Sequence, residues 1–342
     1  MALFQPGESS FVNGPPIRLG TVLYGKQKAW TFRLQQHGKR RNVSVVAIDL
    51  DTPLEEQGEF DLIIHKVVAL IADEDVDPLS AKRLHNLETY LATRPTVSLD
   101  PMASIRDLCD RFITCQKLDG LCLSKGPGEK LSVPNWLAIR DDTPELEAKD
   151  MSTLAAALQG SEDQPPAMAF PMVAKPFIAD GNANSHQMAL VWDMEGVASV
   201  PKPVVLQPFV NHGGYIYKIY ILGDHIAQMT RPSLPDMDAA SLAEKQGFEY
   251  FGRVSNAREC GDAKLVSDEG IVYPSHQLIA EAARHVRTRM GITLFGIDLI
   301  RDADTQEFLL IDVNYLPGYY GVDNLHEQLL TAVQEIVAHR KQ

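Results

Sequence analysis

Three residues near the C-terminal end of the chain carry oxygen ligands within one predicted β-hairpin. Two apolar, strand-like runs, Phe295–Ile300 and Phe308–Val313, are separated by a short polar turn. Asp298 lies in the first run, and Asp312 and Asn314 lie at the end of the second. Residues two apart on a strand point to the same face, so Asp312 and Asn314 should point together. An antiparallel partner strand would bring Asp298 alongside them.

Two carboxylates and an amide oxygen form a ligand set for a hard cation. No sulfur or imidazole stands close to them in the sequence. Such a set suits Mg²⁺, which usually binds few protein ligands together with phosphate oxygens. The alternative is a hairpin with ordinary surface acids. Both aspartates interrupt otherwise apolar runs, where an unpaired charge is costly, and this favours the metal site.

Length and composition indicate a globular protein of two or three domains. The chain has 342 residues, of which 45% are hydrophobic and 23% are charged, and its formal net charge is −13. An acidic balance argues against a general nucleic-acid or membrane-surface binder. It leaves room for a local basic pocket that binds a small polyanion.

The sequence also predicts where the protein resides. Four cysteines lack zinc or CxxC spacing, and we expect them to be reduced thiols: Cys109, Cys115, Cys122 and Cys260. Met1–Pro16 lacks the basic start and apolar core of a signal peptide, and no apolar run is long enough to span a bilayer. We expect a soluble, cytoplasmic or nuclear protein that is not secreted and that acts as a monomer.

The N-terminal third predicts a small parallel sheet. Four short strands alternate with segments that suit helices: Leu19–Tyr24, Val43–Leu50, Asp61–Ile64 and Thr96–Leu99. Lys26 follows the first of these strands, and Lys66 follows the third. Ligands of open α/β sheets gather beyond the carboxyl ends of the strands, so both lysines are placed to reach one. For any single lysine, a solvated strand end is the more common outcome.

Three segments in the middle of the chain have weaker patterns. Ala103–Leu123 is typical of a helix, and it carries Arg111. The Gly and Pro residues of Ser124–Pro134 predict a loop. It is not a P-loop, because it lacks the Gly-Lys-Ser/Thr ending of that motif. Ser233–Gly270 is a long polar stretch that suits a lid or an insertion.

Two amphipathic helices close the chain. Apolar residues recur at helical spacing in His276–Met290, with Ser275 as a candidate N-cap and Gly291 as a C-terminal stop. Leu325–Ala338 has a second stripe of this kind. Both stripes are explained by packing against a core.

The segment that begins at Met172 has the residue types that bind phosphate. Met172–Pro176 reads as a strand carrying Lys175, and a loop of small residues, Asp180–His186, follows it. Lysine supplies a point charge to phosphates, and a small-residue loop supplies backbone N–H groups. His186 could donate to a phosphoryl oxygen or to a substrate. The alternative is an exposed loop with a solvated histidine.

Two further strands follow in the predicted order. Pro203–Val210 is apolar except for Gln207, and Tyr215–Leu222 carries one charge, Lys218. A charge in such a run needs a partner, so Lys218 either pairs with an acid or points into a phosphate-lined cleft.

In combination, these elements resemble the ATP-grasp fold, an α/β fold in which a nucleotide lies between two α+β subdomains. The elements are two strand lysines, the Gly-rich loop between them and the late Asp/Asp/Asn hairpin. An N-terminal parallel-sheet α/β domain would precede the two subdomains. We therefore divide the chain into a flexible tail, a substrate-binding domain, a central subdomain and a C-terminal subdomain: 1–17, 18–102, 103–209 and 210–342.

Within that fold, the chain resembles the inositol-tetrakisphosphate 1-kinase family, also called inositol trisphosphate 5/6-kinases. The motifs that carry the resemblance span Leu50 to Tyr319 and include DLIIHK at Asp61–Lys66, AKPFIADGNANSHQM at Ala174–Met188, VLQPFVNHGG at Val205–Gly214 and IDVNYLPGY at Ile311–Tyr319. The resemblance implies an enzyme that uses ATP and Mg²⁺ to phosphorylate hydroxyls of soluble inositol phosphates.

The resemblance also implies roles for matching residues. ATP phosphates would be contacted by Arg111 and Lys175. Adenine would be contacted by the Gln207–Val210 hinge, with Gln207, Phe209 and Val210. Further nucleotide contacts would come from Lys218, Arg231, Ser233 and Ser255. The Mg²⁺ ligands would be Asp298, Asp312 and Asn314. The inositol phosphate would be contacted by Lys26, Lys66, His186, Lys218, Asn314 and Gly318. The catalytic contacts would be Lys218 and His186.

The match is loose in one place, and two other functions stay open. Gly252–Ser255 corresponds only loosely to a serine-richer family segment, which leaves the contacts of Ser255 open. An ATP-grasp carboxylate–amine ligase, acting through an acyl phosphate, is the main alternative. Such ligases more often end the metal hairpin in Glu-x-Asn, whereas this chain has Asp312-x-Asn314. A non-catalytic nucleotide-binding module is the third hypothesis, and the presence of all three metal ligands argues against it.

Overall fold

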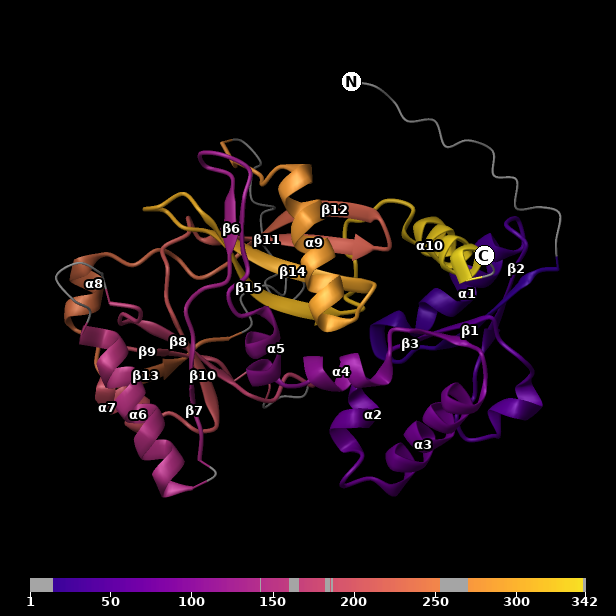
Figure 1. The fold of residues 1–342 in the computed structure, drawn as a ribbon, viewed down its shortest axis with the longest axis horizontal. Coiled ribbons are helices and arrows are strands. Elements are labelled where there is room, and N and C mark those ends of the chain that lie inside the picture. The colour runs from indigo at the N-terminus through magenta and orange to yellow at the C-terminus, as the bar shows by residue number, and fades with distance from the viewer. Residues whose placement is uncertain are drawn as a thin grey trace. The chain divides into compact units, whose positions relative to one another are not determined.

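The computed structural model describes residues 15–141, 143–159, 166–181, 185, 187–252 and 270–340, with Lys26 and Leu146 described by their backbones alone. The chain forms two compact units (Figure 1). The first unit comprises Met1–Met102, Leu222–His225 and Leu316–Gln342, and the second comprises Ala103–Ile221 and Ile226–Tyr315. In the described part of the chain, no helix is long and apolar enough to cross a membrane. The division into four segments stays a prediction.

A four-stranded parallel sheet forms the centre of the first unit. Its strand order is β2-β1-β3-β4, and every pairing in it is parallel, which confirms the prediction. The strands are β1 (Ile17–Val22), β2 (Val43–Ala47), β3 (Leu62–His65) and β4 (Val97–Leu99). The helices of this unit are η1 (Gly25–Gln27), α1 (Lys28–Gly38), η2 (Leu54–Gln57), α2 (Val68–Asp73), α3 (Pro78–Thr93) and α10 (Leu325–Arg340).

Helices cover this sheet through apolar side chains. Leu84, Leu87 and Tyr90 of α3 pack with Val22 and Ile63 of the sheet in one buried cluster. Helix α1 packs against β2 and against α10. Burial of these large apolar side chains, at about 25 cal/mol per Å², is the main term that stabilises the unit.

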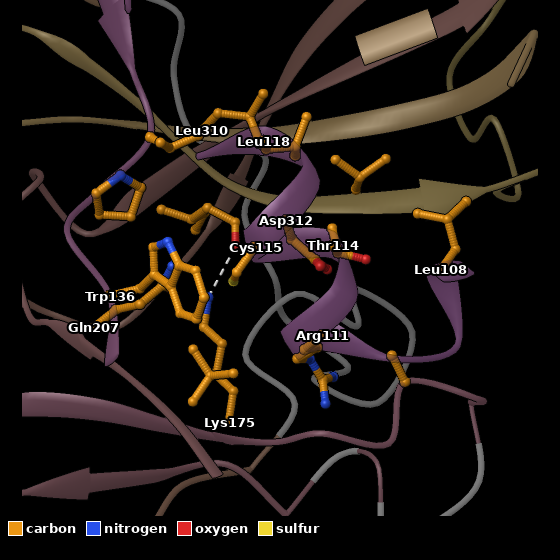
Figure 2. A pocket seen from close by; sticks show the side chains of 16 residues that line it. Leu108, Arg111, Thr114, Cys115, Leu118, Trp136, Lys175, Gln207, Leu310 and Asp312 are labelled. Atoms are coloured by element: carbon orange, nitrogen blue, oxygen red, sulfur yellow. Dashed lines mark hydrogen bonds between the residues drawn. The ribbon is translucent and has the colours of Figure 1, made fainter. Parts of the chain in front are cut away.

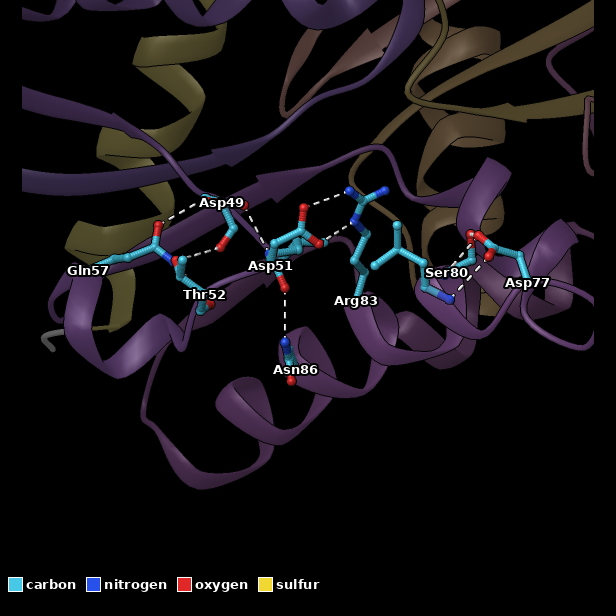
Figure 3. A network of polar contacts seen from close by, with 10 residues as sticks. Asp49, Asp51, Thr52, Gln57, Asp77, Ser80, Arg83 and Asn86 are labelled. Atoms are coloured by element: carbon cyan, nitrogen blue, oxygen red, sulfur yellow. Dashed lines mark hydrogen bonds and ion pairs between the residues drawn. The ribbon is translucent and has the colours of Figure 1, made fainter.

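One glutamine organises the loop that follows β2. The Gln57 side chain accepts from the Asp49 N–H at 2.9 Å and donates to the Asp49 carbonyl at 2.7 Å and to Thr52 Oγ1 at 3.0 Å. Arg83 holds the Asp51 carboxylate through two hydrogen bonds of 2.8 and 2.7 Å (Figure 3). The Gln57 and Arg83 side chains therefore fix the loop that follows the carboxyl end of β2.

The second unit contains two sheets. The five-stranded sheet has the order β13-β9-β8-β10-β7, with antiparallel pairing throughout. Its strands are β7 (Leu137–Ile139), β8 (Met172–Pro176), β9 (Ala189–Val191), β10 (Val204–Pro208) and β13 (Phe248–Tyr250). Leu154 of α6 (Pro144–Gln159) and Val197 of α7 (Met194–Ser199) pack with its strands in one apolar cluster.

The six-stranded sheet has the order β12-β11-β14-β15-β6-β5. Its strands are β5 (Cys122–Ser124), β6 (Lys130–Ser132), β11 (Tyr215–Leu222), β12 (His225–Pro232), β14 (Leu294–Arg301) and β15 (Phe308–Tyr315). The remaining helices are α4 (Met102–Leu108), α5 (Arg111–Leu118), α8 (Ala239–Ala243) and α9 (His276–Met290). Helix α9 packs against β5, β6 and α5.

Two predictions of local structure were wrong. Ala103–Leu123 is not one helix, because Asp110 leaves the helical conformation and caps α5 by accepting from the N–H groups of Phe112 and Ile113 at 2.7 and 3.3 Å. The loop expected at Ser124–Pro134 is a hairpin of β5 and β6. Its Gly residues form the turn, where Gly126 and Gly128 have positive φ.

The predicted ends of α9 are confirmed. The Ser275 hydroxyl accepts from the Leu278 N–H at 3.2 Å, and Gly291 takes the left-handed conformation with φ 68°. The Gly291 N–H closes the helix on the Arg287 carbonyl at 2.8 Å.

Substitution of Gly291 separates two costs. A Cβ there would lie 2.7 Å from Ser104 Oγ, whereas a Cβ at Gly120, which has a similar φ of 67°, would meet nothing within 4 Å. We expect Gly120→Ala to lower the free energy of unfolding by about 1 kcal/mol, because alanine is strained in the left-handed backbone. Gly291→Ala should lower it by about 2 kcal/mol, because the contact with Ser104 adds to the same strain. Urea unfolding measures both. Equal losses, or a Gly291→Ala loss that Ser104→Ala does not reduce, would contradict this explanation.

The stability of the protein should fall in acid because of His65. This side chain is fully buried, and burial lowers the pKa of its imidazole from 6.5 to about 4. Its folded form therefore binds fewer protons than the unfolded chain, and stability is lost as the pH falls from 6.5 to 4, by about 3 kcal/mol. The urea midpoint should fall as the pH is lowered through this range in the wild type, and it should fall less in His65→Gln. His85→Gln is the control: because His85 is exposed on α3, this change should leave the pH dependence of the midpoint as in the wild type.

Candidate functional site

The oxygen ligands meet on the hairpin of β14 and β15. Asp298 lies directly opposite Asp312 in the strand register. Asn314 Nδ2 donates to Asp312 Oδ2 at 3.2 Å, so these two side chains share a face of the strand. The predicted placement of the three residues is confirmed, and their role as metal ligands stays a prediction.

An irregularity in β15 shapes this hairpin. Asp298 pairs with Asp312, but the next residue, Leu299, pairs with Leu310, so Ile311 is an extra residue with no counterpart on β14. A bulge of this kind leaves the extra residue outside the regular ladder and turns the strand locally. The Ile311 carbonyl oxygen accepts a hydrogen bond from Lys175 Nζ at 2.8 Å.

Lys175 therefore reaches from one sheet to the other. It belongs to β8 of the five-stranded sheet, and its ammonium binds the bulge of β15 in the six-stranded sheet. The side chain is half-buried, and desolvation lowers the pKa of its ammonium, while Asp312 opposes this shift. A partly desolvated ammonium near a carboxylate can neutralise an anionic ligand.

A second lysine pairs with an acid, as one of the two alternatives predicted. Lys218 of β11 donates to Asp298 Oδ2, and both side chains are largely buried. Burial alone would lower the pKa of Lys218, but Asp298 raises it above its ordinary value. Burial also raises the pKa of Asp298, and Lys218 opposes that rise. The pair is therefore desolvated and close to the Asp312 carboxylate.

The donor set fits Mg²⁺. Among the described residues, no group of three or more His, Cys, Asp or Glu side chains could hold a metal ion, so any site here depends on the Asn314 amide. Asp298 keeps one carboxylate oxygen free of its Lys218 contact, and Asp312 faces it across the strands. Oxygen ligands alone, and few of them, are what Mg²⁺ takes from proteins.

A pocket lies beside this hairpin, between the two sheets (Figure 2). Side chains from α5, β8, β10 and β15 gather around it, and Lys175, Gln207 and Asp312 are among them. Its other lining residues are mostly apolar: Leu108, Arg111, Thr114, Cys115, Leu118, Val133, Pro134, Trp136, Ala179, Val205, Leu310, Ile311 and Val313. Apolar walls with a few convergent polar groups are typical of a small-molecule site.

Several of these lining residues were not predicted from the sequence as site residues, and Thr114, Cys115 and Trp136 are among them. Thr114 and Cys115 follow Arg111 by three and four residues on α5, so helical spacing alone places them on its face. Burial raises the pKa of the Cys115 thiol to about 11, which keeps it protonated. No sequence pattern placed Trp136 at the pocket, because tertiary contacts position its ring. Trp136 Nε1 donates to Asp119 at 3.0 Å, and the Phe112 ring packs against it edge to face.

The hinge residues lie at the end of β10. The Gln207 side chain is buried and lines the pocket. The Phe209 N–H donates to the Pro171 carbonyl at 2.8 Å, which ties the hinge to the start of β8. The Val210 carbonyl accepts from His212 Nδ1 at 2.6 Å.

His212 also holds a predicted nucleotide contact. Its Nε2 lies 2.9 Å from the Ser233 hydroxyl. Because the Val210 carbonyl can only accept, Nδ1 carries a proton, and Nε2 is the ring atom that pairs with the Ser233 hydroxyl. Asp236 fixes the same turn by accepting from the N–H groups of His212 and Gly213 at 2.7 and 2.9 Å.

The other predicted residues are spread over the structure. Arg231 lies on β12, where its Nη2 is 3.7 Å from Met229 Sδ. Lys26 and Lys66 belong to the first unit, in η1 and directly after β3. Gly318 also belongs to it, and a Cβ there would lie 2.5 Å from the Tyr320 ring. His186 and Ser255 lie outside the described residues.

Comparison with protein families identifies both parts of the chain. Residues 130–335 match the inositol 1,3,4-trisphosphate 5/6-kinase ATP-grasp domain, and residues 21–105 match the pre-ATP-grasp domain of the same family. The chain belongs to this family. It is therefore an inositol phosphate kinase by family, with the predicted ATP-grasp fold, and the ligase alternative is not favoured.

Curated relatives agree with the family over most of their length. The chain is 36% identical to inositol-tetrakisphosphate 1-kinase 4 of Glycine max over 304 residues, which cover 88% of this chain and 82% of the relative. It is 33% identical to inositol-tetrakisphosphate 1-kinase 1 of Arabidopsis thaliana, with 87% and 88% covered.

Two solved structures with a similar fold are ligases. An ATP-grasp ligase from Chryseobacterium gregarium, in complex with ADP and a leader and core peptide, matches 95% of this chain and 97% of its own with a TM-score of 0.56. A D-alanine–D-alanine ligase from Bacillus anthracis matches 94% and 98% with a TM-score of 0.52. Both are 13% identical to this chain, so they show a shared fold alone.

Removal of the His212 ring should destabilise the second unit. His212→Ala leaves a cavity and removes the hydrogen-bond partner of the Val210 carbonyl and of the Ser233 hydroxyl. We therefore expect the free energy of unfolding to fall by about 2–3 kcal/mol. Urea unfolding measures it, with exposed His85→Ala as the control. A loss below about 1 kcal/mol, the ordinary effect of one surface change, would show that the ring does not hold the turn.

Proposed function

We propose that the protein transfers the γ-phosphoryl group of ATP to a hydroxyl of soluble inositol tris- and tetrakisphosphates, in a reaction that requires Mg²⁺. More highly phosphorylated inositols would be further substrates. The observation that supports the proposal is the half-buried Lys175, which is bonded to the Ile311 carbonyl next to Asp312 at one pocket, on the hairpin that also carries Asp298 and Asn314, in a member of this family. Phosphoryl transfer needs positioned cations more than covalent chemistry, and this site supplies them.

The second unit would hold the nucleotide. Lys175 would contact its phosphates, and the Gln207–Val210 hinge would contact adenine, with the Gln207 side chain already in the pocket. Ser233, held by His212, and Arg231 would add contacts, as would Ser255. Bound Mg²⁺ would neutralise charge on the transferred group, held by Asp298, Asp312 and Asn314.

The inositol phosphate would be contacted by the residues that the family resemblance implies: Lys26, Lys66, His186, Lys218, Asn314 and Gly318. Lys218 and His186 would make the catalytic contacts, by stabilising charge on the transferred group. Lys218 suits this role because its ammonium is desolvated and held in place by Asp298.

A ligase remains the alternative chemistry within the fold. The structural likeness to ligases rests on 13% identity, which shows no shared reaction. The family match favours the kinase. We further propose that the enzyme works as a monomer in the cytoplasm or nucleus and binds neither nucleic acid nor membranes.

The test is an ATP/Mg²⁺ assay against inositol tris-, tetrakis-, pentakis- and hexakisphosphates, with products resolved by phosphorus NMR. We expect one new phosphate monoester on at least one tris- or tetrakisphosphate. Lys175→Met should lower kcat/KM by about 100-fold or more, because a half-buried phosphate-binding cation is lost. Lys245→Met is the matched control, since Lys245 is exposed and pairs with Glu249 on the surface.

Two results would contradict the proposal. If Lys175→Met were as active as Lys245→Met, Lys175 would not be part of the phosphate-binding site. ATP consumption that requires a carboxylic acid and an amine, with no change in any inositol phosphate, would favour the ligase.

A further inference from the structure

Two segments of the second unit are joined beside the pocket. The Arg111 N–H donates to the Phe177 carbonyl at 2.7 Å, and the Ala179 N–H donates to the Cys109 carbonyl at 2.7 Å. Between these bonds, Asp110 and Ile178 form an antiparallel bridge. The start of α5 is therefore paired with the residues that directly follow β8, the strand that carries Lys175.

The Arg111 side chain reinforces this junction. Its Nη1 donates to the carbonyls of Pro176 and Ile178, both at 2.7 Å, and its Nη2 donates to the carbonyl of Ser185 at 2.9 Å. One guanidinium thus binds both ends of the 176–185 segment. Pro176, the first of these partners, directly follows Lys175.

This guanidinium lies in a desolvated position. Burial lowers the pKa of Arg111, and Asp312 opposes that shift. A guanidinium stays charged in proteins, so this partly buried cation needs acceptors. Three backbone carbonyls supply them, which makes the contacts charge-assisted and strong.

We propose that Arg111 is a positioning residue, which ties Pro176, Ile178 and Ser185 to α5 and thereby holds Lys175 in the pocket. The family resemblance implies instead that Arg111 contacts the ATP phosphates. A guanidinium has five N–H groups, and three of them are bonded to these carbonyls, so at most two are left for a ligand. The proposal rests on the proposed function for its kinetic consequences, but not for the clamp itself.

Lysine cannot replace this clamp. Its ammonium is a single point on a flexible stem, whereas the planar fork of arginine directs donors to several acceptors at fixed angles. A phosphate contact, in contrast, is partly kept by a lysine, since it depends mainly on charge. Arg111→Lys therefore distinguishes the two roles.

The chain contains a matched control at the other end of α5. Arg289 Nη1 donates to the Lys117 and Asp119 carbonyls at 3.4 and 2.8 Å, and Arg289 does not line the pocket. Arg289→Lys makes the same chemical change at an arginine that also binds two carbonyls. It should leave the kinetics unchanged.

The first measurement is hydrogen exchange of the protein without nucleotide. In the wild type, the Ala179 amide should be protected, and in Arg111→Lys it should exchange about tenfold faster or more, the factor expected for loss of a charge-assisted hydrogen bond. Amides of β14 should exchange as in the wild type. This readout does not depend on catalysis, so it stands even if no inositol phosphate is phosphorylated.

The second measurement is steady-state kinetics. Arg111→Lys should raise the KM for ATP about tenfold or more and lower kcat, while the KM for the inositol phosphate changes less than about twofold. An unprotected Ala179 amide in the wild type would overturn the proposal without any variant. Wild-type exchange of the Ala179 amide in Arg111→Lys, or near-wild-type KM and kcat, would overturn the proposal as well. Either result would show that a positive charge at position 111 is enough and that the fork of the guanidinium is not needed.

Discussion

The candidate site depends on one hydrogen bond, from the Lys175 ammonium to the Ile311 carbonyl. This bond joins the two sheets of the second unit, and its acceptor is the residue of the β15 bulge that has no counterpart on β14. The Ile311 carbonyl accepts from Lys175 of β8, and Asp312, the next residue, lies opposite Asp298. The half-buried cation therefore lies next to the hairpin that carries the carboxylates.

The charges around this bond are balanced but desolvated. Burial lowers the pKa of Lys175 and raises that of Asp298, so each charged form is disfavoured on its own. Lys218 stabilises the Asp298 carboxylate, and Asp312 stabilises both lysines. Carboxylates and ammonium groups with so little water around them gain much from a metal ion and a polyphosphate. In a chain of net charge −13, such cations mark the place where an anion would bind.

The sequence predicted what depends on local periodicity. Alternation along two apolar runs placed Asp298, Asp312 and Asn314 together, and helical spacing with a Ser cap and a Gly stop gave the bounds of α9. It did not predict the bulge at Ile311, because any run of apolar residues is compatible with a regular ladder. It also missed the break before α5. Asp110 carried the N-cap signal, but the apolar pattern on both sides of it suited one continuous helix.

The basic residues of the pocket differ in how many donors they keep for a ligand. Among described partners, the Lys175 ammonium uses one of its three N–H groups, on the Ile311 carbonyl. Arg111 uses three of five, and its geometry is fixed by backbone carbonyls. The lysine therefore has most of its donors available, whereas the arginine has most of them committed to the protein. Sequence motifs treat both as phosphate ligands because they record residue type and spacing, but the acceptors that each side chain has already bound decide what it can offer to ATP.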